Sequence, residues 1–200
     1  MKPTLFLIFS LFSPLLITAQ EGRAIPRGRN VMYETPSSVE INDLQFLREE
    51  ELLAGDVYKY FYTLYPLPFF RNIPKSEDAH TASIEFLLDK YSLPDPGKFH
   101  KAGVFKSPEL EKLYNDLIKK GSASIIEALT VSALIEEMDI YDLKEAMGRV
   151  KNNDDILFVY SNLRRASGNH LRVFTRHLTA RGVNYSPSYL SDEEYRGIVE

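Results

Sequence analysis

The motif Glu77-x-x-His80 places a carboxylate and an imidazole three residues apart in a segment with helical periodicity. Residues i and i+3 of a helix have Cβ atoms roughly 5–6 Å apart, so the two side chains can serve one site. The same helix face carries residues at alternating intervals of three and four: Ile73, Ile84, Leu87 and Tyr91. Asp78 falls outside this face. Because burying bare ionisable groups is costly, Glu77 and His80 are expected to pair or to bind a cation.

A second helical segment, residues 41–65, also carries an acid on its apolar face. Glu51 continues a series made of Leu47, Ala54, Tyr58 and Phe61. Glu50 lies beside it on a second apolar face and is the alternative inward acid. Glu49 shares its face with polar residues, so its side chain is expected to be exposed.

A third segment, residues 122–147, places a carboxylate in another apolar stripe. Glu136 continues the series Leu129, Ala133, Ile140 and Leu143. Asp139 follows Glu136 by three residues, and the adjacent Glu137 is the alternative inward acid. This segment therefore offers two carboxylates to the same interior.

The fourth long segment, residues 154–180, places an imidazole on its apolar face. His170 belongs to a series that contains Ile156, Tyr160, Leu163 and Phe174. Ser167 stands three residues before His170, where a second inward carboxylate would complete a Glu-x-x-His pattern. This segment therefore offers His170 as a nitrogen ligand without an adjacent acid.

Each of these groups has an ordinary structural explanation when taken alone. A single inward histidine is more often a hydrogen-bonded core residue than a ligand. A single inward glutamate can pair with an arginine such as Arg164 or Arg172. However, all four segments direct an acid or imidazole inward without a matching set of inward cations. This pattern favours a carboxylate-bridged metal site inside a helical bundle.

The order of the segments predicts an all-α fold with four long antiparallel helices. Residues 41–65 and a helix starting near Asn72 are joined by a short loop, as are residues 122–147 and 154–180. The connection between the second and third long helices is long and contains a short helix from Pro108 to Gly121. Short loops join antiparallel neighbours, whereas the long connection must travel the length of the bundle. The expected bundle spans residues 41–181, and residues 182–200 form a C-terminal tail.

The first 19 residues have the layout of a secretory signal peptide. Lys2 precedes an apolar run from Leu5 to Ile17, and small residues follow it near Ala19. The run is shorter than the ~20 residues of a membrane span. We therefore expect export to the periplasm or the extracellular space. Residues 20–40 are rich in Pro, Gly and Ser and are expected to form a flexible segment.

The net charge and the lack of cysteine exclude several classes of partner and cofactor. The formal net charge of −4 becomes −5 when Lys2 is removed with residues 1–19, and no strongly basic block is present. Nucleic acid is therefore not an expected partner. The chain has no cysteine, which excludes disulfides, thiolate-bound zinc and iron–sulfur clusters. No later apolar stretch is long enough to span a membrane after signal cleavage.

Four runs carry a resemblance to a known family: residues 49–58 (EEELLAGDVY), 72–80 (NIPKSEDAH), 134–140 (LIEEMDI) and 166–172 (ASGNHLR). Together they resemble the ferritin-like proteins catalogued as domain of unknown function 2202, which are relatives of rubrerythrin and bacterioferritin. The resemblance implies a ferritin-like four-helix bundle with a di-iron or di-manganese centre. It covers residues 41–180. Its ligand pattern matches Glu51, Glu77, His80, Glu136 and His170, whereas Ser167 departs from it and Asp139 is the candidate substitute.

Two classes of function follow from this interpretation. The first is an exported metal protein that holds one or two ions of iron or manganese, with zinc as an alternative, and that handles metal or oxidises with oxygen or peroxide. Without cysteine, such an oxidoreductase needs an external electron donor. The second is a metal-free bundle that binds a protein or an envelope component. The sequence leaves the oligomeric state open.

Overall fold

The structure is a computed structural model that describes residues 34–200. Regular secondary structure in this part of the chain is helical, apart from one isolated β-bridge between Lys101 and Val104. The helices are α1 (Ser38–Leu64), α2 (Pro68–Lys90), α3 (Pro108–Gly121), α4 (Ile125–Met147), α5 (Asp154–Thr179) and α6 (Asp192–Val199). The all-α prediction is therefore confirmed. The expected signal peptide at residues 1–19 lies outside the described residues.

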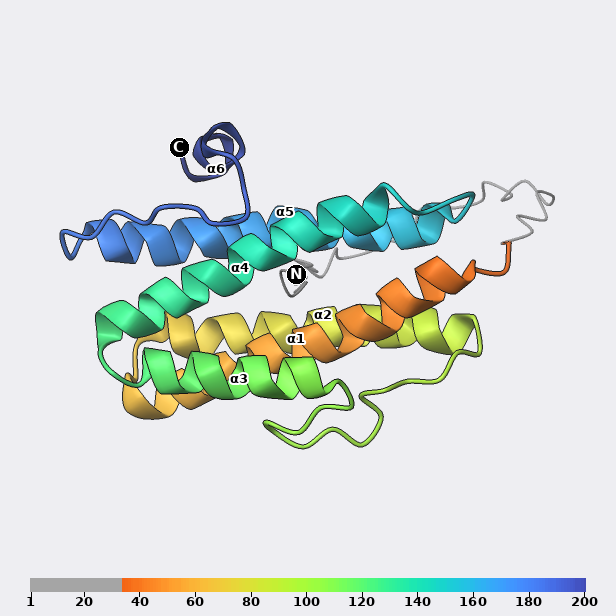
Figure 1. Cartoon of the computed structure of the whole chain (residues 1–200), viewed down its shortest axis with the longest axis horizontal. Helices are drawn as coiled ribbons and strands as arrows, with labels where there is room; N and C mark the ends of the chain where they lie inside the picture. Colours follow the sequence, from red (N-terminus) through yellow and green to blue (C-terminus); the bar gives the residue numbers. More distant parts are fainter. Residues whose placement is uncertain (1–33) are drawn as a thin grey trace, which may run out of the picture.

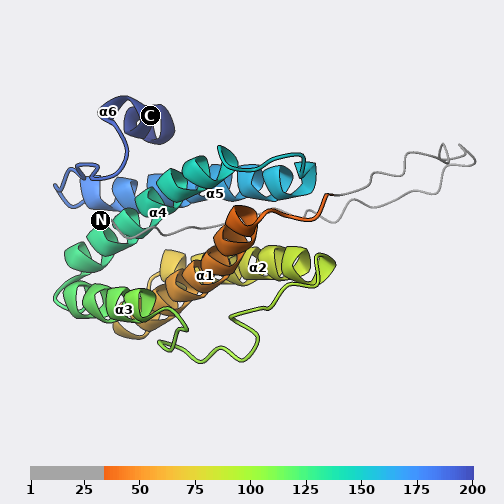
Figure 2. The same ribbon diagram turned by 45° about the vertical axis from the view of Figure 1, so that its right-hand side comes forward.

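The four long helices form a bundle of two antiparallel pairs, α1 with α2 and α4 with α5 (Figure 1). Short connections at residues 65–67 and 148–153 join the members of each pair. Figure 2 shows the two pairs as two layers, with α3 packed beside α1 and α4. The connection at residues 91–124 carries the chain back along the bundle and includes α3 (Figure 1).

Two helices begin earlier than the sequence predicts. The first helix starts at Ser38 instead of residue 41, because Ser37 and Glu40 form a capping box that satisfies backbone N–H groups. The second starts at Pro68 instead of near Asn72. Proline is well tolerated at a first helical position, since its missing N–H would have no partner there. The predicted helix start near Asn72 is therefore wrong, and that residue lies inside α2.

The C-terminal tail contains a helix that the sequence analysis did not predict. Ser191 and Glu194 form a capping box at the start of α6. Arg172 of α5 donates a 2.6 Å hydrogen bond to the carbonyl oxygen of Ile198 near the end of α6. A Cβ on Gly168 would lie 3.4 Å from the Ile198 side chain, so the glycine allows close packing of α6 on α5. The tail is thus docked on the bundle.

Two apolar clusters fill the bundle, and buried polar side chains lie between them. One cluster contains Tyr58, Phe61, Phe70 and Phe174 among its members. The other contains Leu44, Leu47, Ile84, Leu87 and Leu163. On α1, α2 and α5 the inward polar residues occupy the turns between these clusters. No described helix is long and apolar enough to span a membrane.

Candidate metal centre

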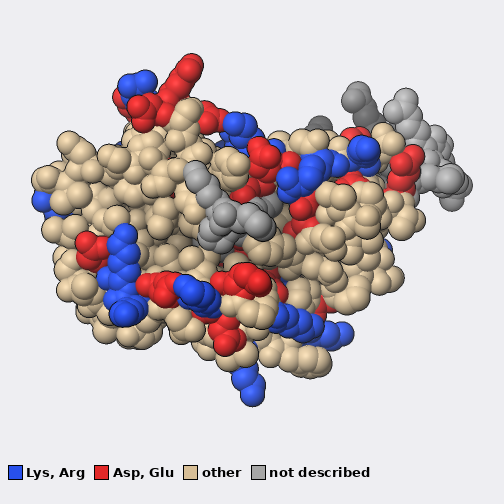
Figure 3. Space-filling model, in the orientation of Figure 1, with Lys and Arg blue, Asp and Glu red and all other residues tan. Residues whose placement is uncertain are grey.

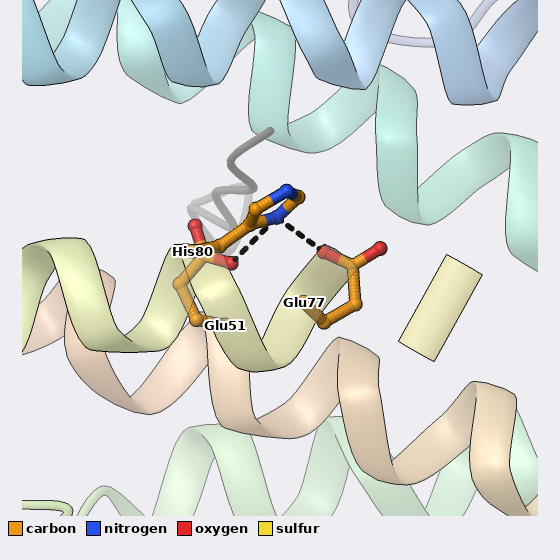
Figure 4. Close-up of side chains that lie close together, drawn as sticks. All are labelled: Glu51, Glu77 and His80. Carbon is orange, nitrogen blue, oxygen red and sulfur yellow. Dashed lines mark ion pairs between the residues drawn. The ribbon is translucent and has the colours of Figure 1, made fainter. Parts of the chain in front are cut away.

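Glu77 and His80 on α2 face each other in the bundle interior, and Glu51 of α1 approaches them (Figure 4). Nδ1 of His80 lies 2.6 Å from Oε2 of Glu77 and 3.6 Å from Oε2 of Glu51. All three side chains are buried. Their ligand atoms lie within 4.8 Å of one another, which is close enough to hold one metal ion.

A second group lies on the other side of Glu77. Nδ1 of His170 lies 3.4 Å from Oε1 of Glu77 and 3.3 Å from Oε1 of Glu136. These three side chains also have ligand atoms within 4.8 Å of one another and are buried. The α2–α5 pairing therefore brings the two histidines together, and the ring centroids of His80 and His170 are 5.9 Å apart.

Glu77 belongs to both groups. Its Oε2 faces His80 and its Oε1 faces His170, so one carboxylate lies between two potential ion positions. Glu51 and Glu136 then stand at opposite ends of the arrangement. Gly55 of α1 lies beside Glu77, because a Cβ there would be 3.4 Å from the Glu77 Cβ. The absence of a side chain at Gly55 lets α1 and α2 approach at the height of the shared carboxylate.

Tyr58 fixes the orientation of Glu136. Its hydroxyl donates a 2.7 Å hydrogen bond to Oε1 of Glu136, and both side chains are completely buried. Burial, with a further contribution from the neighbouring Glu136 carboxylate, raises the pKa of Tyr58 well above its usual value. The phenol therefore stays protonated at neutral pH and serves as a donor to the carboxylate.

Burial shifts the pKa of Glu77 and of His80 in opposite directions. Desolvation, reinforced by the Glu136 and Glu51 carboxylates, raises the pKa of Glu77 well above its ordinary value. Desolvation also lowers the pKa of His80 well below its ordinary value, and His170 contributes to this shift. The buried acids are thus poorly compensated by protein charge. Among the described residues Arg48 is the one buried Lys or Arg, and it pairs with Asp95 and Glu85 instead.

Asp139 lies one turn after Glu136 on α4 and is completely buried. Burial raises its pKa well above the ordinary value, and the carboxylates of Glu136 and Glu51 add to the shift. Asp139 therefore interacts electrostatically with acids of both groups, although it is a member of neither. Ser167, which occupies the position of the expected fourth-helix acid, donates a 3.1 Å hydrogen bond to the carbonyl oxygen of Leu163 in its own helix.

The alternative acids have different surroundings. Glu50 is completely buried, and desolvation together with Asp142 and Glu51 raises its pKa well above the ordinary value. It therefore lies beside the cluster but outside both three-residue groups. Glu137 points to the C-terminal tail, where it accepts hydrogen bonds from the Tyr185 hydroxyl and from three consecutive backbone N–H groups of residues 188–190.

Glu49 corrects one sequence prediction. It was expected to be exposed, but its side chain is buried. Its carboxylate accepts hydrogen bonds from the backbone N–H groups of Lys106 and Ser107, just before α3. The prediction treated the face of Glu49 as solvent-facing, whereas the connection at residues 91–107 covers it. A helix pattern carries no information on which distant loop will cover a polar face.

The fold and the site define a helical bundle with a buried carboxylate–histidine cluster. A family model for the uncharacterized protein domain DUF2202 matches residues 40–200, so the chain belongs to this family. The uncharacterized protein MJ0754 of Methanocaldococcus jannaschii is 46% identical over 153 residues, which cover 76% of this chain and 82% of that protein. The crystal structure titled as hypothetical protein MJ0754 from Methanococcus jannaschii matches with a TM-score of 0.80 and 41% identity, covering 91% of this chain and 97% of that one.

Proposed function

We propose that the protein is an exported, ferritin-like metal protein with a dinuclear carboxylate–histidine centre. The observation that carries this proposal is the position of Glu77, whose two oxygens face two histidines in two overlapping ligand groups. In this arrangement Glu51 and His80 would hold one ion, Glu136 and His170 would hold the other, and Glu77 would contribute a carboxylate oxygen to each. Oxygen and imidazole ligands of this kind suit iron and manganese, with zinc as a competitor.

The charge of the cluster supports two ions. Glu51, Glu77, Glu136 and Asp139 are completely or almost completely buried and would carry four negative charges when ionised. Two divalent cations supply four positive charges, so the site becomes neutral without buried lysine or arginine. Asp139 thereby restores the fourth carboxylate that Ser167 does not supply. A buried cluster of this composition is costly without such compensation.

The bundle would contribute position and protection to the chemistry at this centre. A bound redox metal would supply electron transfer to oxygen or peroxide. Tyr58 holds Glu136 in place through its hydrogen bond, and the aromatic cluster around Phe61, Phe70 and Phe174 keeps water from one end of the site. Because the chain has no cysteine, an oxidoreductase role requires an external electron donor. Export rests on the signal-like pattern of residues 1–19.

The proposal is tested by loading the purified metal-free protein with Fe(II), Mn(II) or Zn(II) under anaerobic conditions. Two equivalents of metal per chain, retained after gel filtration, are expected. Glu77→Ala should lose both ions and His80→Ala should lose the ion beside Glu51, while circular dichroism shows that the helices remain. A wild-type protein that retains no metal, and whose stability does not change on addition of iron or manganese, would instead indicate the metal-free binding module.

A further inference from the structure

The connection between α2 and α3 is held rigidly against the outer face of α1. Arg48 donates a 2.9 Å hydrogen bond to Asp95 at the start of this segment. Asp56 accepts a 2.9 Å hydrogen bond from the backbone N–H of Gly103, and its Oδ2 also lies 2.8 Å from Nε2 of His100. Glu49 binds the backbone at the end of the segment. A segment without regular structure is thus fixed at three places by α1.

This fixed segment exposes an unusual combination of side chains. Residues 96–106 contain three lysines and no acid. All three, Lys98, Lys101 and Lys106, are exposed and make no ion pair within the described chain. Phe99 is 87% exposed and Val104 is 57% exposed. These side chains line a hollow of about 410 Å³, whose wall also includes Asp95. The loop therefore combines three lysine amino groups, two exposed apolar side chains and a hollow.

The acids that lie beneath the loop are bound to other groups. Asp95 is held by Arg48, and its side chain is only 7% exposed. Asp56 and Glu49 are buried beneath the loop, where they bind His100 and backbone N–H groups. Figure 3 shows Lys and Arg side chains projecting from the lower edge of the molecule, with Asp and Glu side chains among them, where the connection lies in Figure 1. Residues 96–106 therefore present three exposed lysines, although the chain as a whole carries a net charge of −4 and the exposed Glu109 follows Lys106 by three residues.

We propose that residues 96–106 form a peripheral docking site for a membrane surface that contains anionic phospholipids. The lysine amino groups bind headgroup phosphates, one of which occupies the hollow, and Phe99 and Val104 enter the interface between headgroups and acyl chains. Basic residues close to an anionic leaflet are attracted to it, and aromatic rings partition well into the interfacial region. Because α1 already fixes the loop, binding requires little further ordering of the chain.

The shape of the loop favours a lipid surface over a protein partner. Figures 1 and 2 show the connection extending beyond α1 and α3 at the edge of the bundle. The exposed Phe99, which lies between Lys98 and Lys101 in the sequence, suits a soft, negatively charged plane. Phe86 and Phe158 are also exposed, at 67% and 70%, but they lie on helices and not on a basic projection. They provide matched controls for a merely exposed aromatic ring.

The test measures binding of the chain from residue 20 onward, which retains every described helix, to sedimenting vesicles at low salt. Vesicles of phosphatidylcholine with 30% phosphatidylglycerol are compared with pure phosphatidylcholine. Wild-type protein should bind the anionic vesicles at least tenfold more tightly, and binding should weaken as salt is raised. Phe99→Ser should weaken binding by roughly tenfold, and the double variant Lys98→Glu with Lys101→Glu should abolish it. Phe158→Ser and Lys112→Glu should bind within about twofold of wild type.

Three results would overturn the proposal. The first is wild-type protein that ignores anionic vesicles at low salt. The second is binding that survives both loop variants, each verified as folded by circular dichroism. The third is a preference for a soluble ligand. Saturable binding of glycerol phosphate that Phe99→Ser leaves intact would indicate a site for free phosphate. Binding of polyglutamate without binding of vesicles would indicate an acidic protein partner. Metal content of the variants should match wild type, which separates this proposal from the function of the centre.

Discussion

The hydroxyl of Tyr58 donates a 2.7 Å hydrogen bond to Oε1 of Glu136 inside the bundle. Both groups are completely buried, so removing the hydroxyl leaves a carboxylate oxygen without its donor. We expect Tyr58→Phe to lower the free energy of unfolding of the metal-free protein by about 1.5–3 kcal/mol, the range for hydrogen bonds to charged groups. Urea denaturation measures this. In the metal-loaded protein Tyr58→Phe should cost less stability, because a metal ion would also bind Glu136. An equal loss in the metal-loaded and metal-free proteins would argue against metal at Glu136.

Asp139 and Ser167 offer a test of how the site obtains a fourth carboxylate. Asp139→Asn removes one negative charge with little change in shape, so it should weaken binding of one ion by about tenfold or more. Adding Ser167→Glu to this variant should recover part of the affinity, since it returns an acid to the helix that carries His170. Isothermal titration with Mn(II) measures both effects. Unchanged affinity in Asp139→Asn would remove Asp139 from the ligand set.

The raised pKa values of the buried acids predict how pH affects the metal-free protein. Burial raises the pKa of Glu50, Glu77 and Asp139 in the folded state. These groups hold protons that the unfolded chain has released, so their stabilising effect is complete below their unfolded pKa and is lost as pH rises. His80 has a lowered pKa and acts oppositely, but only below its unfolded value of 6.5. Above that pH the acids alone determine the trend.

We therefore expect the unfolding free energy of metal-free protein to fall as pH rises from the ordinary carboxyl range through the raised pKa of these acids, by at most about 1.4 kcal/mol per pH unit for each protonated acid. Metal-loaded protein should show a much weaker dependence, because the ligands are already deprotonated. Metal binding at pH 7 should also release protons, which calorimetry in buffers of different ionisation enthalpy detects. A flat stability profile for the metal-free protein, together with no proton release, would contradict this description of the cluster.

Glu137 is expected to act on the C-terminal tail and not on metal binding. Its carboxylate accepts hydrogen bonds from the Tyr185 hydroxyl and from the backbone N–H groups of Ser188 and Leu190, among others. Glu137→Ala should therefore increase hydrogen exchange and proteolysis in residues 183–200 and leave two ions bound. Glu193→Ala, an exposed position in α6, is the control and should change neither property. Loss of metal in Glu137→Ala with an intact tail would place this residue in the centre.

The inward direction of the site residues could be read from the sequence because helical periodicity fixes which side chains share a face. Glu77 and His80 interrupt an apolar series, and the structure places them with Glu51, Glu136 and His170. Which of these residues belong to the same ligand group could not be predicted, because periodicity gives no distances between helices. Neither the shared position of Glu77 nor the contact of Tyr58 with Glu136 could be obtained from one helix at a time.

The errors of the sequence analysis concern segments without strong periodicity. Glu49 was expected to face solvent, but the connection at residues 91–107 covers it, and its carboxylate accepts a hydrogen bond from the backbone of this connection. The short helix α6 was missed because eight residues give little periodic signal, although Ser191 and Glu194 carry the spacing of a capping box. From the sequence alone, a buried carboxylate that accepts hydrogen bonds from a loop backbone therefore cannot be distinguished from a surface residue.

The most direct measurement of the central claim is the number of metal ions bound by single-carboxylate variants. Because Glu77 lies between both histidines while Glu51 and Glu136 each face one, Glu51→Gln and Glu136→Gln should each retain one ion. Glu77→Gln should retain none, and Asp78→Asn, at an exposed position on the same helix, should retain two. Equal stoichiometry in Glu77→Gln and Asp78→Asn, determined by elemental analysis of the folded proteins, would contradict a centre bridged by Glu77.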